Sequence, residues 1–245
     1  MPRMKINGYT LIELLVGLAL GALTMVWVYQ IFASQQQLHL GQQRTVQLQQ
    51  NLRATLQRMA EEIRMAAYDP KATGAFGFLH QPDPGDPDYG RATATAAIAF
   101  TTDADGNGTL DNSDLEQVGF RLNVAQDGSA LDGTAGKTPD HVLRKFSCGA
   151  VAWQPFAQDI ETVRFVYFDH AGTIVPEADL PGRLNEIRGV QINLVGRQTK
   201  QGKNYTNRNV YRDPQGDILY AAPGDHLRRQ MVTSTVTCRN RVEPW

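Results

Sequence analysis

The chain contains little cysteine, since only Cys148 and Cys238 occur among its 245 residues. Two cysteines are too few for a disulfide-dense miniprotein or for a zinc module built on several cysteines. No single sign of charge dominates either, because 24 basic residues face 25 acidic ones, which argues against a strongly basic nucleic-acid-binding chain. Hydrophobic residues make up 42% of the chain and charged residues 20%, so bulk disorder and fibrous repeats are also excluded.

The sequence also lacks the common motifs of catalysis. It contains no G-x-S-x-G, no H-E-x-x-H, no phosphate-binding loop and no dinucleotide fingerprint. Its five histidines are scattered, without the spacing of a metal pair. We therefore expect no catalytic residues and no enzymatic activity. The alternative of another class is a membrane-anchored periplasmic enzyme, which would be active and monomeric without any assembly machinery.

The balanced net charge hides an uneven distribution along the chain. Residues 69–180 carry seven basic and seventeen acidic groups, whereas residues 181–245 carry eleven basic and five acidic ones. This asymmetry predicts two surfaces with different partners. A basic surface can bind nucleic acid through its phosphates, but a solvated face or a subunit interface is the favoured interpretation, so nucleic acid is an unlikely partner.

The N-terminus carries a long apolar run behind a short basic leader. Residues 1–8 contain Arg3 and Lys5 without an acidic residue, and residues 9–32 are almost entirely apolar or small. A helix of that length, about 36 Å, crosses a bilayer core, and the basic leader places itself on the cytoplasmic side. Because the run is longer than a secretory signal and no A-x-A site follows it, we expect it to stay as an anchor.

The helix is expected to continue beyond the membrane. Residues 33–69 contain no proline. Their apolar positions form one stripe at spacings of three and four residues: Leu48, Leu52, Leu56, Met59 and Ile63. The pair Asp69-Pro70 stops this helix near residue 68. The sequence therefore predicts one helix of about 59 residues, lipid-compatible in its first half and amphipathic in its second.

One acidic residue, Glu13, interrupts the apolar run. A carboxylate in a membrane costs free energy and calls for a partner. Cleavage after Gly8 would create an amine at Tyr9, four residues away, which a neighbouring copy could pair with Glu13. From spacing alone, this interpretation and that of a tolerated interfacial glutamate in a plain anchor remain equally open.

The segment Gly8-Tyr9-Thr10-Leu11-Ile12-Glu13-Leu14 resembles the class III signal of type IV pilins and type II secretion pseudopilins. The resemblance implies cleavage between Gly8 and Tyr9 by a prepilin peptidase, N-methylation of Tyr9, and a role for Glu13 in assembly. Tyr9 stands where phenylalanine is usual. Gln30 occupies the place of a proline that many major pilins carry, which favours a minor pilin or a pseudopilin.

Beyond Pro70 the chain changes to β character. Residues 70–93 are interpreted as a loop rich in Gly, Pro and Asp. Strands are expected at residues 94–102, 117–124, 142–148, 162–169, 187–195 and 231–238. The predicted fold class is α+β and pilin-like: a long N-terminal helix packed on a mainly antiparallel β domain of residues 70–245. The order of its strand motifs resembles the PilW family of minor pilins, with pseudopilin J of type II secretion as a close competitor.

The two cysteines lie beyond the membrane segment, on the oxidising side. A Cys148–Cys238 disulfide is expected there, closing a loop of about 90 residues. The alternative is two separate buried thiols.

A second motif lies in the acidic middle of the chain. The segment from Asp103 to Asp114 follows the D-x-D-x-N-G spacing of calcium loops, and calcium prefers six to eight oxygen ligands. We expect Ca²⁺ to be bound by Asp103, Asp105, Asn107, Thr109, Asp111 and Asp114. Asp114 is shorter than the usual glutamate, although Glu116 follows. The alternative is a hairpin turn that contains these residues for backbone reasons.

These observations predict a minor pilin that helps to initiate or cap a type IV pilus. The alternative within the class is a pseudopilin at the tip of a type II secretion pseudopilus. The expected partners are other pilins, prepilin peptidase and the inner-membrane assembly machinery. The expected location is the inner membrane, crossed once with a periplasmic β domain, and then the filament at the cell surface.

Overall fold

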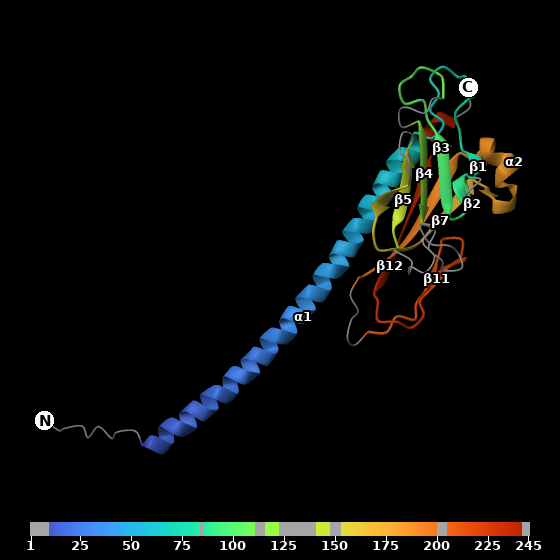
Figure 1. The fold of residues 1–245 in the computed structure, drawn as a ribbon. Helices are drawn as coiled ribbons and strands as arrows, with labels where there is room; N and C mark the ends of the chain where they lie inside the picture. The colour runs from blue at the N-terminus through green and yellow to red at the C-terminus, as the bar shows by residue number, and fades with distance from the viewer. Residues whose placement is uncertain are drawn as a thin grey trace. The chain divides into compact units, whose positions relative to one another are not determined.

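The structure is a computed structural model, and it describes residues 10–83, 86–110, 116–122, 141–147, 153–199 and 205–241. The chain divides into two compact units, Met1–Val46 and Gln47–Trp245. Figure 1 shows both units, and each is described below by itself.

The long helix α1 spans Leu11–Arg64, 54 residues. It ends four residues before the predicted stop at residue 68. The reason is tertiary: Ala67 adopts a positive φ of 59°, and its N–H donates to the carbonyl of Thr101 at 2.8 Å instead of continuing the helix. The N–H groups of Met65 and Ala66 donate to the carbonyls of Glu62 and Ile63, three residues earlier, and these 3₁₀-type hydrogen bonds close the last turn.

The amphipathic stripe predicted for the second half of the helix is confirmed. Within the unit that begins at Gln47, Leu48, Leu52, Met59 and Ile63 are buried, and Leu56 packs against the same core. Their spacing keeps them on one side of the helix, where they cover the sheets of the β domain. This part of α1 is therefore fixed by apolar burial.

Two four-stranded antiparallel sheets form the β domain. The first has the order β3-β4-β5-β6, from Ala97–Thr101, Gln117–Leu122, Leu143–Ser147 and Gln154–Ala157. The second has the order β12-β9-β7-β8, from Arg229–Thr237, Gly189–Arg197, Ile160–Phe168 and Ile174–Val175. The six predicted strands correspond to β3, β4, β5, β7, β9 and β12, with ends that shift by a few residues.

Two separate hairpins were not predicted. Residues 70–93 contain β1 (His80–Asp83) and β2 (Asp86–Ala92), so the interpretation of this segment as a loop was wrong in part. A second hairpin joins β10 (Val210–Arg212) and β11 (Ile218–Ala221). Both hairpins are short, and they depend on the pairing between their strands more than on local β propensity. Composition alone therefore does not predict them.

Short helical turns lie between β8 and β9. They are η1 (Glu177–Asp179), α2 (Leu180–Arg183) and η2 (Leu184–Glu186), and a last turn, η3, spans Arg239–Arg241. The Glu177 carboxylate accepts hydrogen bonds from the N–H and the hydroxyl of Thr95, at 3.1 and 3.0 Å, which ties η1 to the segment before β3.

One apolar core joins α1 to both sheets. Phe165 and Tyr167 of β7, Phe100 of β3 and Phe120 of β4 are essentially fully buried. The Tyr167 hydroxyl donates to the carbonyl of Ala94 at 2.8 Å, so this buried tyrosine is satisfied. The α+β class predicted from the sequence, a long helix packed on antiparallel sheet, is confirmed.

Candidate functional site

The first turn of α1 brings Glu13 next to Thr10. The Glu13 carboxylate lies 3.4 Å from both the N–H and the hydroxyl of Thr10, and the Thr10 hydroxyl oxygen accepts from the Glu13 N–H at 3.4 Å. This reciprocal arrangement is a capping box, which satisfies N–H groups that the first helical turn leaves free. Gly8 and Tyr9, the predicted cleavage and methylation residues, lie outside the described residues.

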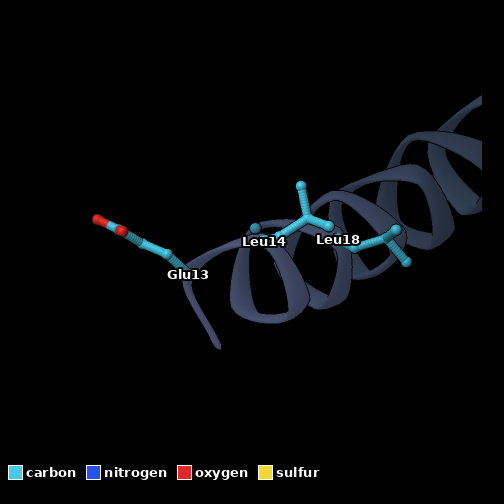
Figure 2. A pocket seen from close by; sticks show the side chains of 4 residues that line it. Glu13, Leu14 and Leu18 are labelled. Carbon is cyan, nitrogen blue, oxygen red and sulfur yellow. The ribbon is translucent and has the colours of Figure 1, made fainter. Parts of the chain in front are cut away.

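The capping role of Glu13 is one that sequence reasoning missed, although the Thr-x-x-Glu spacing signals it. Figure 2 shows the Glu13 carboxylate pointing away from the helix, while Leu14 and Leu18 lie along its side. With Gly17, these residues line a shallow open hollow. Glu13 is therefore an accessible charge at the start of an apolar helix.

The apolar part of α1 is exposed along its whole length. Every large apolar side chain from Leu11 to Phe32 is more than half exposed. By length and composition the helix can cross a membrane, since an 18-residue window reaches a mean hydropathy of 2.2. An exposed apolar surface of this extent is typical of a segment that contacts lipid or other proteins.

The part of the predicted calcium loop that the structure describes, residues 103–110, is a compact turn that follows β3. Asp103 is fully buried, and its two carboxylate oxygens accept the N–H groups of Gly106 and Gly108 at 2.8 and 3.0 Å. Asp105 accepts the N–H of Asn107 at 2.8 Å. The Asn107 side-chain oxygen accepts from the N–H and hydroxyl of Thr109, at 2.6 and 2.5 Å.

Three carboxylates converge at this turn. One oxygen from each of Asp103, Asp105 and Glu116 lies within 4.8 Å of the others. Glu116, which the sequence analysis did not include among the ligands, is buried and joins this group. Asp111 and Asp114, two of the predicted ligands, lie outside the described residues. One oxygen from each carboxylate supplies three of the six to eight oxygens that calcium needs. Asn107 would have to turn its oxygen from Thr109 to join them.

A lysine lies at the outer side of the same turn. Lys71 donates from Nζ to the carbonyl oxygen of Asn107 at 2.7 Å, and a Cβ built at Gly108 would lie 2.7 Å from the Lys71 side chain. Gly108 also has a positive φ of 76°, which favours glycine. Backbone geometry and the contact with Lys71 thus hold this part of the loop.

The predicted disulfide can be placed at one end only. Cys238 follows β12 and is fully buried, and its N–H donates to the carbonyl of Arg188 at 2.9 Å. Cys148 lies outside the described residues, so the pairing stays a prediction.

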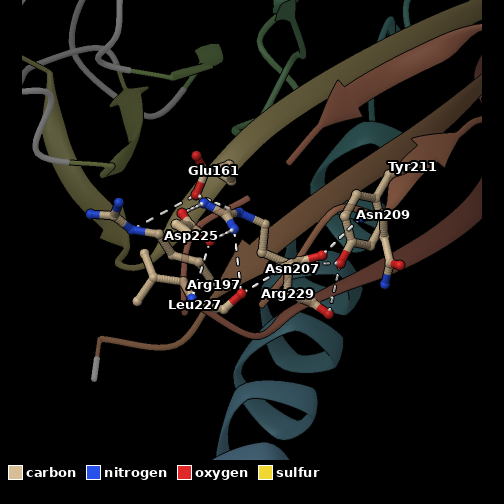
Figure 3. A network of polar contacts seen from close by, with 8 residues as sticks. All are labelled: Glu161, Arg197, Asn207, Asn209, Tyr211, Asp225, Leu227 and Arg229. Carbon is tan, nitrogen blue, oxygen red and sulfur yellow. Dashed lines mark hydrogen bonds and ion pairs between the residues drawn. The ribbon is translucent and has the colours of Figure 1, made fainter. Parts of the chain in front are cut away.

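A buried polar network, also missed by the sequence analysis, holds the chain that leads into β12. Figure 3 shows Arg229 between two carboxylates. Its Nη2 lies 2.6 Å from Asp225 Oδ2, and its Nε lies 3.2 Å from Glu161 Oε2. The Arg197 Nε approaches the same Glu161 oxygen at 3.8 Å. Arg229 is almost fully buried, so its pairing with two acids is required to offset the loss of hydration.

The network extends to the β10–β11 hairpin. Asn207 donates to the Leu227 carbonyl at 3.0 Å and accepts the N–H of Asn209 at 3.1 Å, and the Tyr211 hydroxyl donates to the Arg229 carbonyl at 3.2 Å. These contacts, visible in Figure 3, attach the hairpin to the start of β12.

Pairing in this network moves several pKa values. The hydrogen bond from Arg229 lowers the pKa of Asp225 below its ordinary value, against the opposing effect of burial. Burial, together with a hydrogen bond to Glu161, raises the pKa of Tyr220 to about 12. Burial alone would lower the pKa of Arg229, but Asp225 and Glu161 raise it, so the guanidinium stays charged.

Two protein families and one solved structure resemble this chain. Residues 3–29 match the prokaryotic N-terminal methylation motif, and residues 41–212 match the family described as prepilin peptidase-dependent protein B. No match was found among curated proteins. A solved type IV-like pilin from Thermus thermophilus is 13% identical, covers 80% of this chain and 98% of its own length, and has a TM-score of 0.45. Because the second match spans well over half of the sequence, the chain belongs to the family of prepilin peptidase-dependent protein B.

Proposed function

We propose that this protein is a minor pilin, a non-enzymatic subunit that helps to initiate or cap a type IV pilus. The observation that carries the proposal is the continuity of a methylation motif with a helix whose apolar half is exposed and whose amphipathic half packs on its own β domain. Such a helix is suited to lipid before assembly and to a bundle of similar helices afterwards.

The proposal includes processing and location. A prepilin peptidase cuts between Gly8 and Tyr9, and the new amine of Tyr9 is methylated. Before assembly the chain crosses the inner membrane once, with the β domain in the periplasm. Other pilins and the inner-membrane assembly machinery are its partners, and the filament at the cell surface is its destination. A PilW-type minor pilin is the finer assignment that we favour.

Glu13 directs assembly in this proposal. When the helices leave lipid and bundle, an unpaired buried carboxylate costs several kcal/mol, and the Tyr9 amine of a neighbouring subunit offsets much of that cost. The capping box gives Glu13 a second, separate role at the helix start. The two roles can be separated, because glutamine at the third helical position also forms a capping box without a charge.

The experiment is therefore the Glu13→Gln variant, with Thr10→Val as the matched control. Glu13→Gln keeps the cap and removes the charge, so the ratio of protein in sheared filaments to protein in the membrane should fall about tenfold or more. Thr10→Val removes the capping hydroxyl and keeps the charge, so that ratio should stay near that of the wild type. An unchanged ratio for Glu13→Gln would reduce Glu13 to a cap and contradict the proposed assembly role.

The alternative of a type II secretion pseudopilin shares the same signal and helix. Deleting each assembly machinery separately distinguishes the two filaments. Loss of surface protein on deletion of the pilus machinery supports the minor pilin, whereas loss on deletion of the secretion machinery supports the pseudopilin.

We also propose that the turn from Asp103 to Glu116 binds Ca²⁺. Support comes from three converging carboxylates and from the D-x-D-x-N-G spacing. The ion would stabilise the turn between β3 and β4, and it has no role in any reaction.

A further inference from the structure

We propose that the open edge of β12 binds an extended segment of a partner protein by strand addition, and that this segment is uncharged in the middle and acidic at both ends. The proposal rests on the β domain alone and goes beyond the function proposed above. In strand addition, main-chain hydrogen bonds give affinity and the flanking side chains give specificity.

The hydrogen bonds just beyond each end of the β12–β9 pairing show which residues of β12 direct their backbone groups toward β9. The Gln198 N–H donates to the Arg228 carbonyl, and the Cys238 N–H donates to the Arg188 carbonyl, both at 2.9 Å. All nine intervening pairs with β9 follow without a shift. Because bonded and non-bonded pairs alternate in antiparallel sheets, the even-numbered residues of β12 bond to β9. The odd-numbered residues direct their N–H and C=O groups away from β9.

The outward backbone groups of β12 are open from Met231 onward. Arg229, the first odd-numbered residue of the strand, is excluded because its carbonyl accepts the Tyr211 hydroxyl at 3.2 Å. Among the residues that the structure describes, the outward backbone groups have no hydrogen-bond partner at Met231, Thr233, Thr235 and Thr237. Their sheet ends at β12.

The other outer strands of the two four-stranded sheets are protected. Residues 77–79 cover the edge of β3, where the Leu79 N–H donates to Ala99 and the Thr101 N–H donates to Gly77, both at 2.8 Å. β6 has four residues and contains Pro155, and β8 has only two residues. β12 has nine residues, no register shift, and neither charge nor proline from residue 230 to 237. Natural edges usually carry one of these protections against pairing, so their joint absence here indicates an edge that is used.

Charge at the two ends of β12 selects the occupant. Arg228 and Arg239 are both exposed and lie just outside the uncharged stretch. Antiparallel pairing of two copies of β12 would bring Arg228 of one copy near Arg239 of the other, and like charges destabilise such a pair. An extended segment with an acid at each end meets both arginines favourably. Thr233, Thr235 and Thr237 are exposed on one face of the strand, where β-branched partners pack well.

The test uses the full chain in detergent micelles and the synthetic peptide Asp-Val-Thr-Val-Thr-Val-Thr-Val-Thr-Asp, whose eight uncharged residues match the length of the uncharged stretch 230–237. The control is the same peptide with lysine in place of both aspartates. Amide exchange should be fast at Met231, Thr233, Thr235 and Thr237 without peptide, and at least about tenfold slower with the acidic peptide. The lysine peptide should bind at least about tenfold more weakly.

Two variants examine the edge itself. Thr235→Pro removes an outward N–H that β9 does not use, so the fold should remain while binding of the acidic peptide falls about tenfold or more. Thr235→Glu should also weaken binding, because its carboxylate repels the acidic peptide, and it serves if the proline variant fails to fold, while Thr235→Ser should bind as the wild type does. Equal binding of both peptides, binding of the acidic peptide that survives Thr235→Glu, or outward amides already slow without peptide would overturn the proposal. Slowing that depends on protein concentration alone would identify a second copy as the occupant and would also overturn it.

Discussion

Gly196 of β9 packs directly against the leucines of α1. A Cβ built on this residue would lie 2.7 Å from Leu52 Cδ2 and 3.1 Å from Leu48 Cδ1, both buried core atoms. Real Cβ atoms do not come this close, so the helix would have to shift or its leucines would have to change rotamer. The stripe of leucines was visible in the sequence, but the glycine that receives it was not, because the contact joins segments far apart in the chain.

Gly196→Ala should lower the free energy of unfolding by about 1–3 kcal/mol through this overpacking. Gly189→Ala is the matched control, since it lies on the same strand and its nearest non-local atoms are 3.6 Å away. Denaturant titration of the full chain in micelles measures both. Equal stability of the two variants would show that the helix does not press on the sheet at Gly196.

At the scale of elements, the sequence predicted α1 and six strands because their signals lie in consecutive residues. Val163, Phe165 and Tyr167 alternate with more exposed residues on β7, and all three are buried as the pattern indicated. The β10–β11 hairpin carried no such pattern. It is held by polar contacts to the start of β12, including the bond from Tyr211 to Arg229, and no local periodicity encodes those partners.

The ion pair at the base of this hairpin makes part of the stability depend on pH. The pKa of Asp225 is lower in the folded protein than its ordinary value of 3.8, chiefly because Arg229 donates to it. A group with a depressed folded pKa contributes stability that is present above the unfolded pKa and is lost as the pH falls through the folded pKa.

Asp225→Asn should therefore destabilise the protein at pH 7, and the difference from the wild type should shrink as the pH falls below about 4. Thermal melts of both proteins at several pH values measure this. A difference that stays constant down to acid pH would show that the Asp225 charge contributes nothing to the network.

The calcium turn allows a similarly direct test. With a Kd on the order of 10⁻⁴–10⁻³ M, 10 mM calcium should stabilise the domain by about 1.4–2.7 kcal/mol, and magnesium should do less. Asp105→Asn should remove most of this shift, and Glu116→Gln should reduce it, since both carboxylates face the same point. Asp169→Asn, in the turn between β7 and β8, should leave it unchanged.

Asp103 is a poor choice for that test, because its oxygens accept the N–H groups of Gly106 and Gly108 and its loss would damage the turn without any ion. The decisive quantity is the shift in melting temperature on adding calcium, not the basal stability. If 10 mM calcium produces no shift in the wild type, the segment is a backbone turn only.

At the scale of the whole molecule, the sequence predicted an anchor followed by a β domain, because hydropathy and length are local properties. The chemistry of the candidate sites was predicted less completely. The spacing identified Asp103 and Asp105, but the role of Glu116 depends on the start of β4 folding beside them. The network around Arg229 and the open edge of β12 arise from pairing between distant segments, which composition does not contain.

The central claim is that this chain is a processed filament subunit, and mass spectrometry of its N-terminus in sheared filaments tests that claim most directly. The account predicts a mature chain that begins at Tyr9 and carries one methyl group on its amine. A filament-associated chain that still begins at Met1, or a chain cut beyond the apolar helix, would contradict it.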